Sequence, residues 1–140
     1  MQACATHRDR VLVIGGGTIG LLTLAAAVAA GVRETAITVK YPSQAEVAKT
    51  LGADHVIQVG ETSVTDFVKD WTEGGADCVI ETVGGAQNFN DSLACVRKQG
   101  TVVLVAGYFE PLEVDLAKIV WSEAIVTGSN CYAYSGREKD

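Results

Sequence analysis

The feature that most constrains this chain is a glycine-rich turn that joins two apolar segments near its beginning. The continuous apolar run Val11–Ile14 is typical of a strand that is covered on both faces in a parallel sheet. Gly15, Gly17 and Gly20 follow it with the spacing G-x-G-x-x-G, and a helix is expected to begin near Thr18. The stretch therefore predicts a strand, a tight turn and a helix in direct succession.

Each of these glycines has a physical role in such a turn. Gly15 permits the tight turn, Gly17 allows a pyrophosphate to approach the backbone, and Gly20 lets the helix pack closely against the strand. The free N–H groups and the positive dipole end of the helix make the turn an anion site. Leu21 and Leu22 follow in place of the Lys-Ser/Thr pair that ends a P-loop, so a mononucleotide kinase or GTPase is disfavoured.

A membrane span and a nucleic-acid partner are both disfavoured. No charged residue occurs between Arg10 and Arg33, but three consecutive glycines interrupt this stretch, and the apolar run after them is shorter than the roughly 20 residues that cross a bilayer. The net charge is −6, and lysines and arginines are scattered along the chain. This charge pattern favours a small-molecule partner over nucleic acid or an anionic membrane.

The cysteines and histidines show no metal-binding spacing. There is no C-x-x-C pair among the four cysteines, and His7 and His55 stand alone in the sequence, so no metal site is predicted. Cys78 and Cys95 lie in apolar surroundings and are expected to pack in the core. The N-terminus lacks the pattern of a signal or transit peptide, so a reduced, cytoplasmic setting is expected.

Strand and helix patterns alternate along the whole chain. Strands are predicted over 11–14, 36–39, 55–59, 77–81, 101–106 and 124–128. Besides the helix that begins near Thr18, helices are predicted over 44–51, from Thr62 or Ser63 to Trp71, and over 87–97 and 116–121. Ser43 is expected to cap the helix 44–51, with Glu46 as its capping-box partner. This alternation predicts one α/β domain over residues 1–140, a doubly wound six-stranded parallel sheet of strand order 3-2-1-4-5-6.

A ligand of such a sheet binds outside the carboxyl ends of the strands, where the strand order reverses between the first and fourth strands. This rule places the site at the turns 15–20, 40–43, 82–85 and 106–108. Glu81 ends the fourth predicted strand, where it could be a solvent-facing group, and no catalytic role is assigned to it.

Four segments carry a family resemblance. Residues 11–22, 48–57, 75–85 and 100–107 resemble, in order and spacing, the cofactor domain of the medium-chain, zinc-type alcohol and polyol dehydrogenases. The resemblance implies that the N–H groups of Thr18 and Ile19 bind the pyrophosphate of NAD or NADP. It also implies that Thr82 and Val83 line the adenosine and nicotinamide side, and that the nicotinamide is edged by Ala106, Gly107 and Ser129. For Thr82 and Ser129 a plain turn or capping role is an equal alternative.

The end of the second strand bears on the choice between NADP and NAD. NAD-dependent members place an acid there to bind the ribose 2′-hydroxyl, and that position falls on the neutral Val39. Lys40 could reach a 2′-phosphate, Tyr41 could stack on adenine, and Ser43 with its helix N-terminus could add donors. We therefore expect NADP to be preferred. The alternative is a solvated Lys40 and a pocket that accepts either cofactor.

The family's zinc ligands belong to a separate domain and have no counterpart in this sequence. The resemblance thus implies the cofactor-binding part of a longer dehydrogenase that moves hydride between the nicotinamide and an alcohol or carbonyl substrate, with no catalytic residue and no activity in this part alone. It also implies a homodimer in which the segment Ala124 to Gly128 pairs with its twofold mate.

Three other functions are weighed against this one. A free-standing dinucleotide-binding sensor module remains the alternative. A methyltransferase is disfavoured because Val39 and Lys40 stand where its acid would end the second strand. A short-chain dehydrogenase is disfavoured because the sequence contains no Tyr-x-x-x-Lys.

Overall fold

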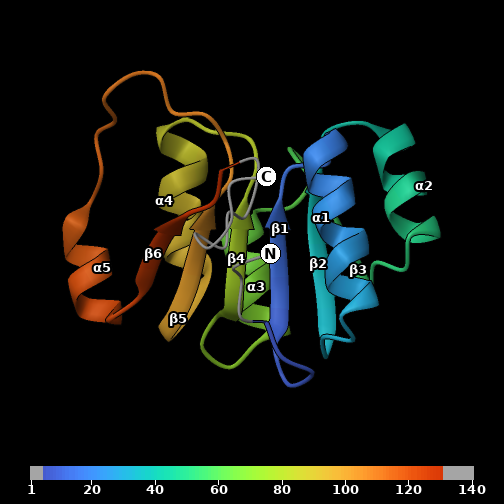
Figure 1. Ribbon diagram of the computed structural model, residues 1–140, viewed down its shortest axis with the longest axis horizontal. Coiled ribbons are helices and arrows are strands. Elements are labelled where there is room, and N and C mark those ends of the chain that lie inside the picture. Colours follow the sequence, from blue (N-terminus) through green and yellow to red (C-terminus); the bar gives the residue numbers. More distant parts are fainter. Residues whose placement is uncertain (1–4, 131–140) are drawn as a thin grey trace, which may run out of the picture.

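The computed structural model describes residues 5–130, and these form one six-stranded sheet with helices on both faces (Figure 1). The strands are β1 (Arg10–Ile14), β2 (Glu34–Val39), β3 (His55–Gln58), β4 (Ala76–Glu81), β5 (Val96–Leu104) and β6 (Ile125–Gly128). The helices are α1 (Thr18–Ala29), α2 (Pro42–Thr50), α3 (Val64–Trp71), α4 (Ala86–Cys95) and α5 (Leu116–Ser122).

The sheet has the predicted topology. Its order is β3-β2-β1-β4-β5-β6, and every neighbouring pair is parallel. Parallel neighbours require crossovers, which the helices supply. The order reverses between β1 and β4, so the carboxyl ends of these two strands flank the switch point of the sheet. The prediction of a doubly wound parallel sheet is confirmed.

Two apolar layers hold the helices to the sheet. On one face, Leu24 of α1 and Ala48 of α2 pack against Val13 and Ile37. On the other, Val68 of α3 and Leu93 of α4 belong to the cluster that contains Leu12 and Val79. Figure 1 shows α1 in front of the sheet and α3 behind it. Residues of β1 thus alternate between the two layers, which explains why its sequence is apolar throughout.

Cys78 and Cys95 are buried on opposite faces of the sheet, as predicted for core residues. Cys4 and Cys131 lie outside the described residues. In the part of the chain that the structure describes, every helix is too short or too polar to cross a bilayer.

The start of α2 corrects one prediction. The helix begins at Pro42, with Tyr41 as its N-cap, so Ser43 lies inside the first turn and does not cap it. The capping partner is Gln44 rather than Glu46, because Gln44 Oε1 accepts from the Tyr41 N–H at 3.1 Å. Proline explains the earlier start, since it favours the first helical position and has no N–H to leave unsatisfied.

The junction of α4 and β5 corrects another. The sequence predicts that this helix runs to Arg97 and that Gly100 stops it. In the structure α4 ends at Cys95, and Arg97 and Gly100 both lie in β5. The β4–β5 register shifts here, with Ala76 opposite Val96 and Cys78 opposite Thr101. The extra residues bulge out of the strand, and Arg97 turns to form an ion pair with Asp77 of β4.

Candidate functional site

A cleft of about 470 Å³ lies at the switch point of the sheet, at the carboxyl ends of β1, β2 and β4. Within the described part of the chain its lining comprises Gly15, Gly16, Gly17, Thr38, Val39, Lys40, Tyr41, Gln44, Val59, Thr82, Val83 and Asn88. Lys40 is the one charged residue in this lining. Although the net charge of the protein is −6, the lining of the cleft contains one cationic side chain and no acidic one.

The glycine turn is anchored from both neighbouring strands. The N–H of Gly15, whose φ is +111°, donates to Thr38 Oγ1 of β2 at 2.9 Å. From the other side, Thr82 donates to the carbonyl of Ile14 with its N–H at 3.0 Å and its hydroxyl at 2.8 Å. A Cβ on Gly20 would lie 1.8 Å from the Gly15 oxygen. The structure thus gives Gly15 and Gly20 the turn and packing roles that the sequence suggests.

Gly17 differs from the other two glycines because it faces open space. It is the N-cap of α1 and has no side chain that could cap the helix, and an added Cβ would meet no atom within 4 Å. Its neighbours Thr18 and Ile19 are exposed. The first N–H groups of α1 thus lie at an uncapped helix end beside the cleft, which fits a phosphate group.

The end of β2 presents Lys40 on a fixed main chain. Its N–H donates to Gln44 Oε1 at 2.9 Å, and its carbonyl accepts from Gln58 Nε2 at 2.7 Å. The ammonium lies 5.5 Å from the centre of the Tyr41 ring, and both side chains are exposed. Val39, by contrast, is 1 % exposed and packs in the core. The residue that follows β2, and not its last residue, carries the charge at this end of the cleft.

Glu81 at the end of β4 corrects the expectation of a solvent-facing group, because it is completely buried. Its carboxylate accepts from the N–H groups of Val83 at 2.6 Å and Gly84 at 2.8 Å, and from the hydroxyl of Tyr108. Burial, followed by the hydrogen bond and the charge of Glu81, raises the pKa of the Tyr108 phenol far above its usual value.

Six of the predicted cofactor residues meet in the cleft: Gly15, Gly17, Lys40, Tyr41, Thr82 and Val83. Seven others do not line it: Thr18, Ile19, Gly20, Ser43, Ala106, Gly107 and Ser129. Ala106 and Ser129 lie further along the same edge of the sheet, where the Ala106 N–H donates to the Glu81 carbonyl at 3.3 Å and the Ser129 N–H to the Leu104 carbonyl at 2.9 Å.

Sequence reasoning missed Thr38, Gln44, Val59 and Asn88 as lining residues. Gln44 had a detectable signal, because a glutamine three residues after a helix N-cap is part of a capping box. Thr38 sits inside an apolar strand, and Asn88, whose amide donates to the Gly84 carbonyl at 2.8 Å, sits in a polar helix turn. Neither pattern distinguishes a lining residue from an ordinary one.

The described residues do not fit a zinc ion. Across residues 5–130, no three side chains of His, Cys, Asp or Glu come together in a way that could hold a metal.

The chain is similar to known dehydrogenases in sequence. The sequence profile of the family described as zinc-binding dehydrogenase matches residues 18–139. L-threonine 3-dehydrogenase of Pyrococcus abyssi is 31 % identical over 128 residues, which cover 91 % of this chain and 36 % of that protein. The chain thus spans about a third of the length of this curated relative.

Solved structures share the fold. The 2R,3R-butanediol dehydrogenase of Bacillus subtilis superposes with a TM-score of 0.86 at 25 % identity, over 95 % of this chain and 38 % of that one. A Sinorhizobium meliloti protein, described as a zinc-binding dehydrogenase bound to NADP, gives a TM-score of 0.80 at 28 % identity, over 91 % and 39 %. The chain therefore belongs to the zinc-binding, medium-chain dehydrogenase family and corresponds to its cofactor-binding domain.

Proposed function

We propose that the cleft binds the dinucleotide NAD(P), and that the chain serves a dehydrogenase that transfers hydride between the nicotinamide and an alcohol or carbonyl substrate. The observation that carries this proposal is the uncapped N-terminus of α1 beside a cleft whose lining has Lys40 as its charged residue. The pyrophosphate would bind at Gly17 and the N–H groups of Thr18 and Ile19.

The remaining predicted residues follow from this placement. Lys40 and Tyr41 would meet the adenosine half, with the α2 N-terminus at Ser43 nearby. Thr82 and Val83 would line the middle of the cofactor. The nicotinamide half would extend toward Ala106, Gly107 and Ser129, because these residues lie along the same sheet edge beyond β4.

We expect NADP to bind more tightly than NAD. The lining contains no carboxylate to bind a ribose 2′-hydroxyl or to repel a 2′-phosphate, and it contains the cationic side chain of Lys40. The relative that is described as bound to NADP supports the same cofactor class. If NADH binds more tightly than NADPH at low salt, the preference is wrong while the dinucleotide site still holds.

Titration of the 140-residue chain with NADH and NADPH, followed by nicotinamide fluorescence, tests the function directly. We expect saturable binding that ADP-ribose competes away. Absence of binding at millimolar cofactor would refute the proposed site. We also propose that this chain alone does not oxidise alcohols, since it spans about a third of a whole relative; zinc-dependent steady turnover by the purified chain would contradict this.

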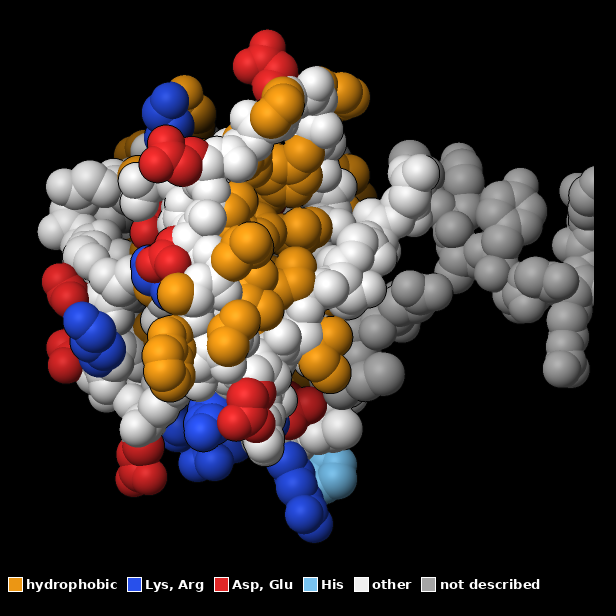
Figure 2. Space-filling view, turned by 90° about the vertical axis from the view of Figure 1, so that its left-hand side faces the viewer, with side chains coloured by type: hydrophobic (Ala, Val, Ile, Leu, Met, Phe, Trp, Pro, Cys, Tyr) orange, Lys and Arg blue, Asp and Glu red, His pale blue; other side chains and the backbone are white. Residues whose placement is uncertain are grey.

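The outer edge of β6 is proposed to pair with a second copy of the chain. The strand lies at the end of the sheet, and Ile125 is 60 % exposed on it. Figure 2 shows hydrophobic side chains gathered on the face that carries α5 and β6, where Leu116, Val120 and Trp121 are exposed. An uncharged edge strand beside an apolar face favours association.

Sedimentation of the wild type and of Ile125→Lys tests the pairing. We expect a dimer that dissociates when a lysine is placed on the edge. A wild type that stays monomeric at high concentration would contradict the proposal. The cytoplasm remains the proposed compartment.

A further inference from the structure

A buried acid outside the lining of the cleft holds two loops of the site together. Glu81 is 0 % exposed, and a carboxylate so deeply buried is costly unless hydrogen bonds replace its water. Three donors do so here: the N–H groups of Val83 and Gly84 and the hydroxyl of Tyr108. The position of this acid is therefore set by the hydrogen bonds it makes.

These bonds lead to two different segments. Val83 belongs to the turn that follows β4, whereas Tyr108 belongs to the loop that follows β5. The main-chain carbonyl of Glu81 adds to the connection, since it accepts from the N–H groups of Val105 at 2.9 Å and Ala106 at 3.3 Å. One residue thus joins the turn 82–85 to the loop 105–108 through both its backbone and its side chain.

The two segments are also in close contact. A Cβ on Gly84, whose φ is +92°, would lie 3.4 Å from the Gly107 oxygen and 3.5 Å from the Ala106 Cβ. The ring of Tyr108 packs edge-on against Phe89 of α4, with centroids 6.3 Å apart. The phenol is therefore held on its ring side by α4 and on its hydroxyl side by Glu81, so it has little freedom to move.

The position of this link relative to the cleft suggests which half of a dinucleotide it affects. With a pyrophosphate at Gly17 and an adenosine half at Lys40, beyond β2, the nicotinamide half must run the other way, across the ends of β4 and β5. Thr82 and Val83 begin that path within the lining of the cleft. The linked segments 82–85 and 105–108 lie along it.

We propose that the hydrogen bond between Glu81 and Tyr108 is a positioning device that fixes the binding surface for the nicotinamide half of the cofactor. Glu81 and Tyr108 are positioning residues, because they act through the turn 82–85 and the loop 105–108 and line no part of the cleft themselves. The inference rests on the proposed function, since it presupposes a dinucleotide in this cleft.

The variant Tyr108→Phe removes the hydroxyl and keeps the ring. Calorimetric titrations would use the cofactor that the wild type binds more tightly, NADH or NADPH. They would also use the matching ligand without nicotinamide, which is ADP-ribose for NADH and 2′-phospho-ADP-ribose for NADPH. We expect the variant to bind the complete cofactor about five-fold more weakly, as for one lost hydrogen bond. Binding of the counterpart without nicotinamide should stay unchanged.

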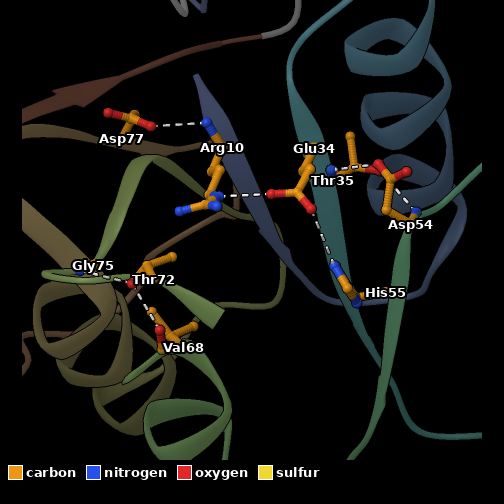
Figure 3. A network of polar contacts seen from close by, with 9 residues as sticks. All are labelled: Arg10, Glu34, Thr35, Asp54, His55, Val68, Thr72, Gly75 and Asp77. Carbon is orange, nitrogen blue, oxygen red and sulfur yellow. Dashed lines mark hydrogen bonds and ion pairs between the residues drawn. The ribbon is translucent and has the colours of Figure 1, made fainter. Parts of the chain in front are cut away.

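Thr72→Val is the matched control. The Thr72 hydroxyl is also buried, donates to the Val68 carbonyl at 2.7 Å and accepts from the Gly75 N–H at 2.8 Å (Figure 3). It precedes the amino end of β4, whereas Glu81 lies at the carboxyl end of that strand. Its loss should lower the melting temperature and leave the binding of both ligands unchanged, which separates a general loss of stability from a positioning effect.

Each other result has a distinct meaning. Equal weakening of both ligands by Tyr108→Phe, or no weakening of either, would overturn the inference while leaving the dinucleotide site in place. Failure of the wild type to bind either ligand would overturn the proposed function, and the inference with it.

Discussion

Polar and charged groups are satisfied differently at the amino ends and at the carboxyl ends of the parallel strands. At the amino ends of the strands, the chain supplies its own counter-charges: Arg10 Nε lies 2.6 Å from Glu34 Oε2, and the Arg10 N–H donates to Asp77 at 2.8 Å (Figure 3). Asp54 likewise accepts from the N–H and hydroxyl of Thr35. At the carboxyl ends, the N-terminus of α1 has no such partner.

The difference separates stability from binding. Arg10, Glu34 and Asp77, at the amino ends of the strands, are paired with one another or with other groups of the chain. Removing one of them should lower the free energy of unfolding and leave ligand affinity unchanged. Gly17 and the side chain of Lys40 face the cleft and make no hydrogen bond to another side chain of the described residues, so changing them should affect ligand affinity and leave the fold intact. The predictions below test this division, beginning with the largest expected effect.

Gly17→Val should abolish dinucleotide binding without unfolding the chain. The new side chain would enter open space in which an added Cβ meets no atom within 4 Å, and this is where the pyrophosphate is proposed to lie. Nicotinamide fluorescence should show affinity falling by more than about a hundred-fold, or about 3 kcal/mol. Thermal melting should change little, because the backbone φ of −74° suits any residue.

Gly20→Ala is the contrasting variant in the same turn. Its Cβ would lie 1.8 Å from the Gly15 oxygen, so the helix must move away from the strand. We expect loss of stability together with loss of binding. Equal melting temperatures for Gly20→Ala and the wild type would contradict the packing role of this glycine.

Asp77→Asn should lower stability and spare binding. Asp77 accepts from the Arg10 N–H and forms an ion pair with Arg97, in a site that is partly exposed. Urea unfolding should show a loss of about 1 to 2 kcal/mol. Titration with NADPH should give the wild-type affinity. A large loss of affinity would mean that the ion pair at the amino ends of the strands affects ligand binding at their carboxyl ends.

Lys40→Ala should weaken NADPH about five-fold at low salt and NADH much less, and the gap should narrow as salt screens the charge. Lys49→Ala is the matched control. Lys49 is an exposed lysine on α2 that forms an ion pair with Glu46 at 3.1 Å and does not line the cleft. If both variants weaken NADPH equally, the effect comes from net charge rather than from a contact.

The smallest effect concerns pH. The hydrogen bond and charge of Arg10 lower the pKa of Glu34 below its usual 4.5. Burial opposes the shift at Asp77, but the Arg10 N–H and Arg97 still bring its pKa below 3.8. Carboxylates with lowered pKa values stabilise the fold fully above their unfolded pKa, and this stabilisation is lost as the pH falls through their folded pKa.

The contribution of Glu34 and Asp77 to the free energy of unfolding should therefore be constant above about pH 5 and decline below that pH. Urea midpoints from pH 7 to pH 3 test this, and Asp77→Asn should show a shallower decline than the wild type. An equally steep decline in both proteins would show that other carboxyl groups control acid unfolding.

The sequence was sufficient for the order of the strands and for the glycine turn because both depend on local signals. The apolar run of β1 and the spacing of Gly15, Gly17 and Gly20 determine a strand, a turn and a helix without reference to distant residues. The site residues that it missed depend on distant contacts instead. Thr38 meets Gly15 only when β2 pairs with β1, and no local pattern encodes that contact.

Glu81 illustrates the same limit. An acid that ends a strand resembles a solvent-facing group, and only the folded chain shows the Tyr108 hydroxyl, 27 residues away, at its carboxylate. The end of α4 was misjudged for a related reason. Arg97 and Lys98 suit a helix C-terminus, but the pairing of Arg97 with Asp77 and the shifted register of β5 place them in a strand.

The main chain at Lys40 is held at its N–H by Gln44 and at its carbonyl by Gln58, while its side chain is exposed and makes no hydrogen bond that fixes it to another residue of the described chain. Replacing the side chain therefore leaves the path of the loop unchanged. Val39 is buried and cannot present a charge to the cleft, so position 40 is where a change of charge would act: an acid there would favour a ribose hydroxyl, and a base a phosphate, on the same scaffold. Cofactor choice could thus change by a single substitution without a cost to folding.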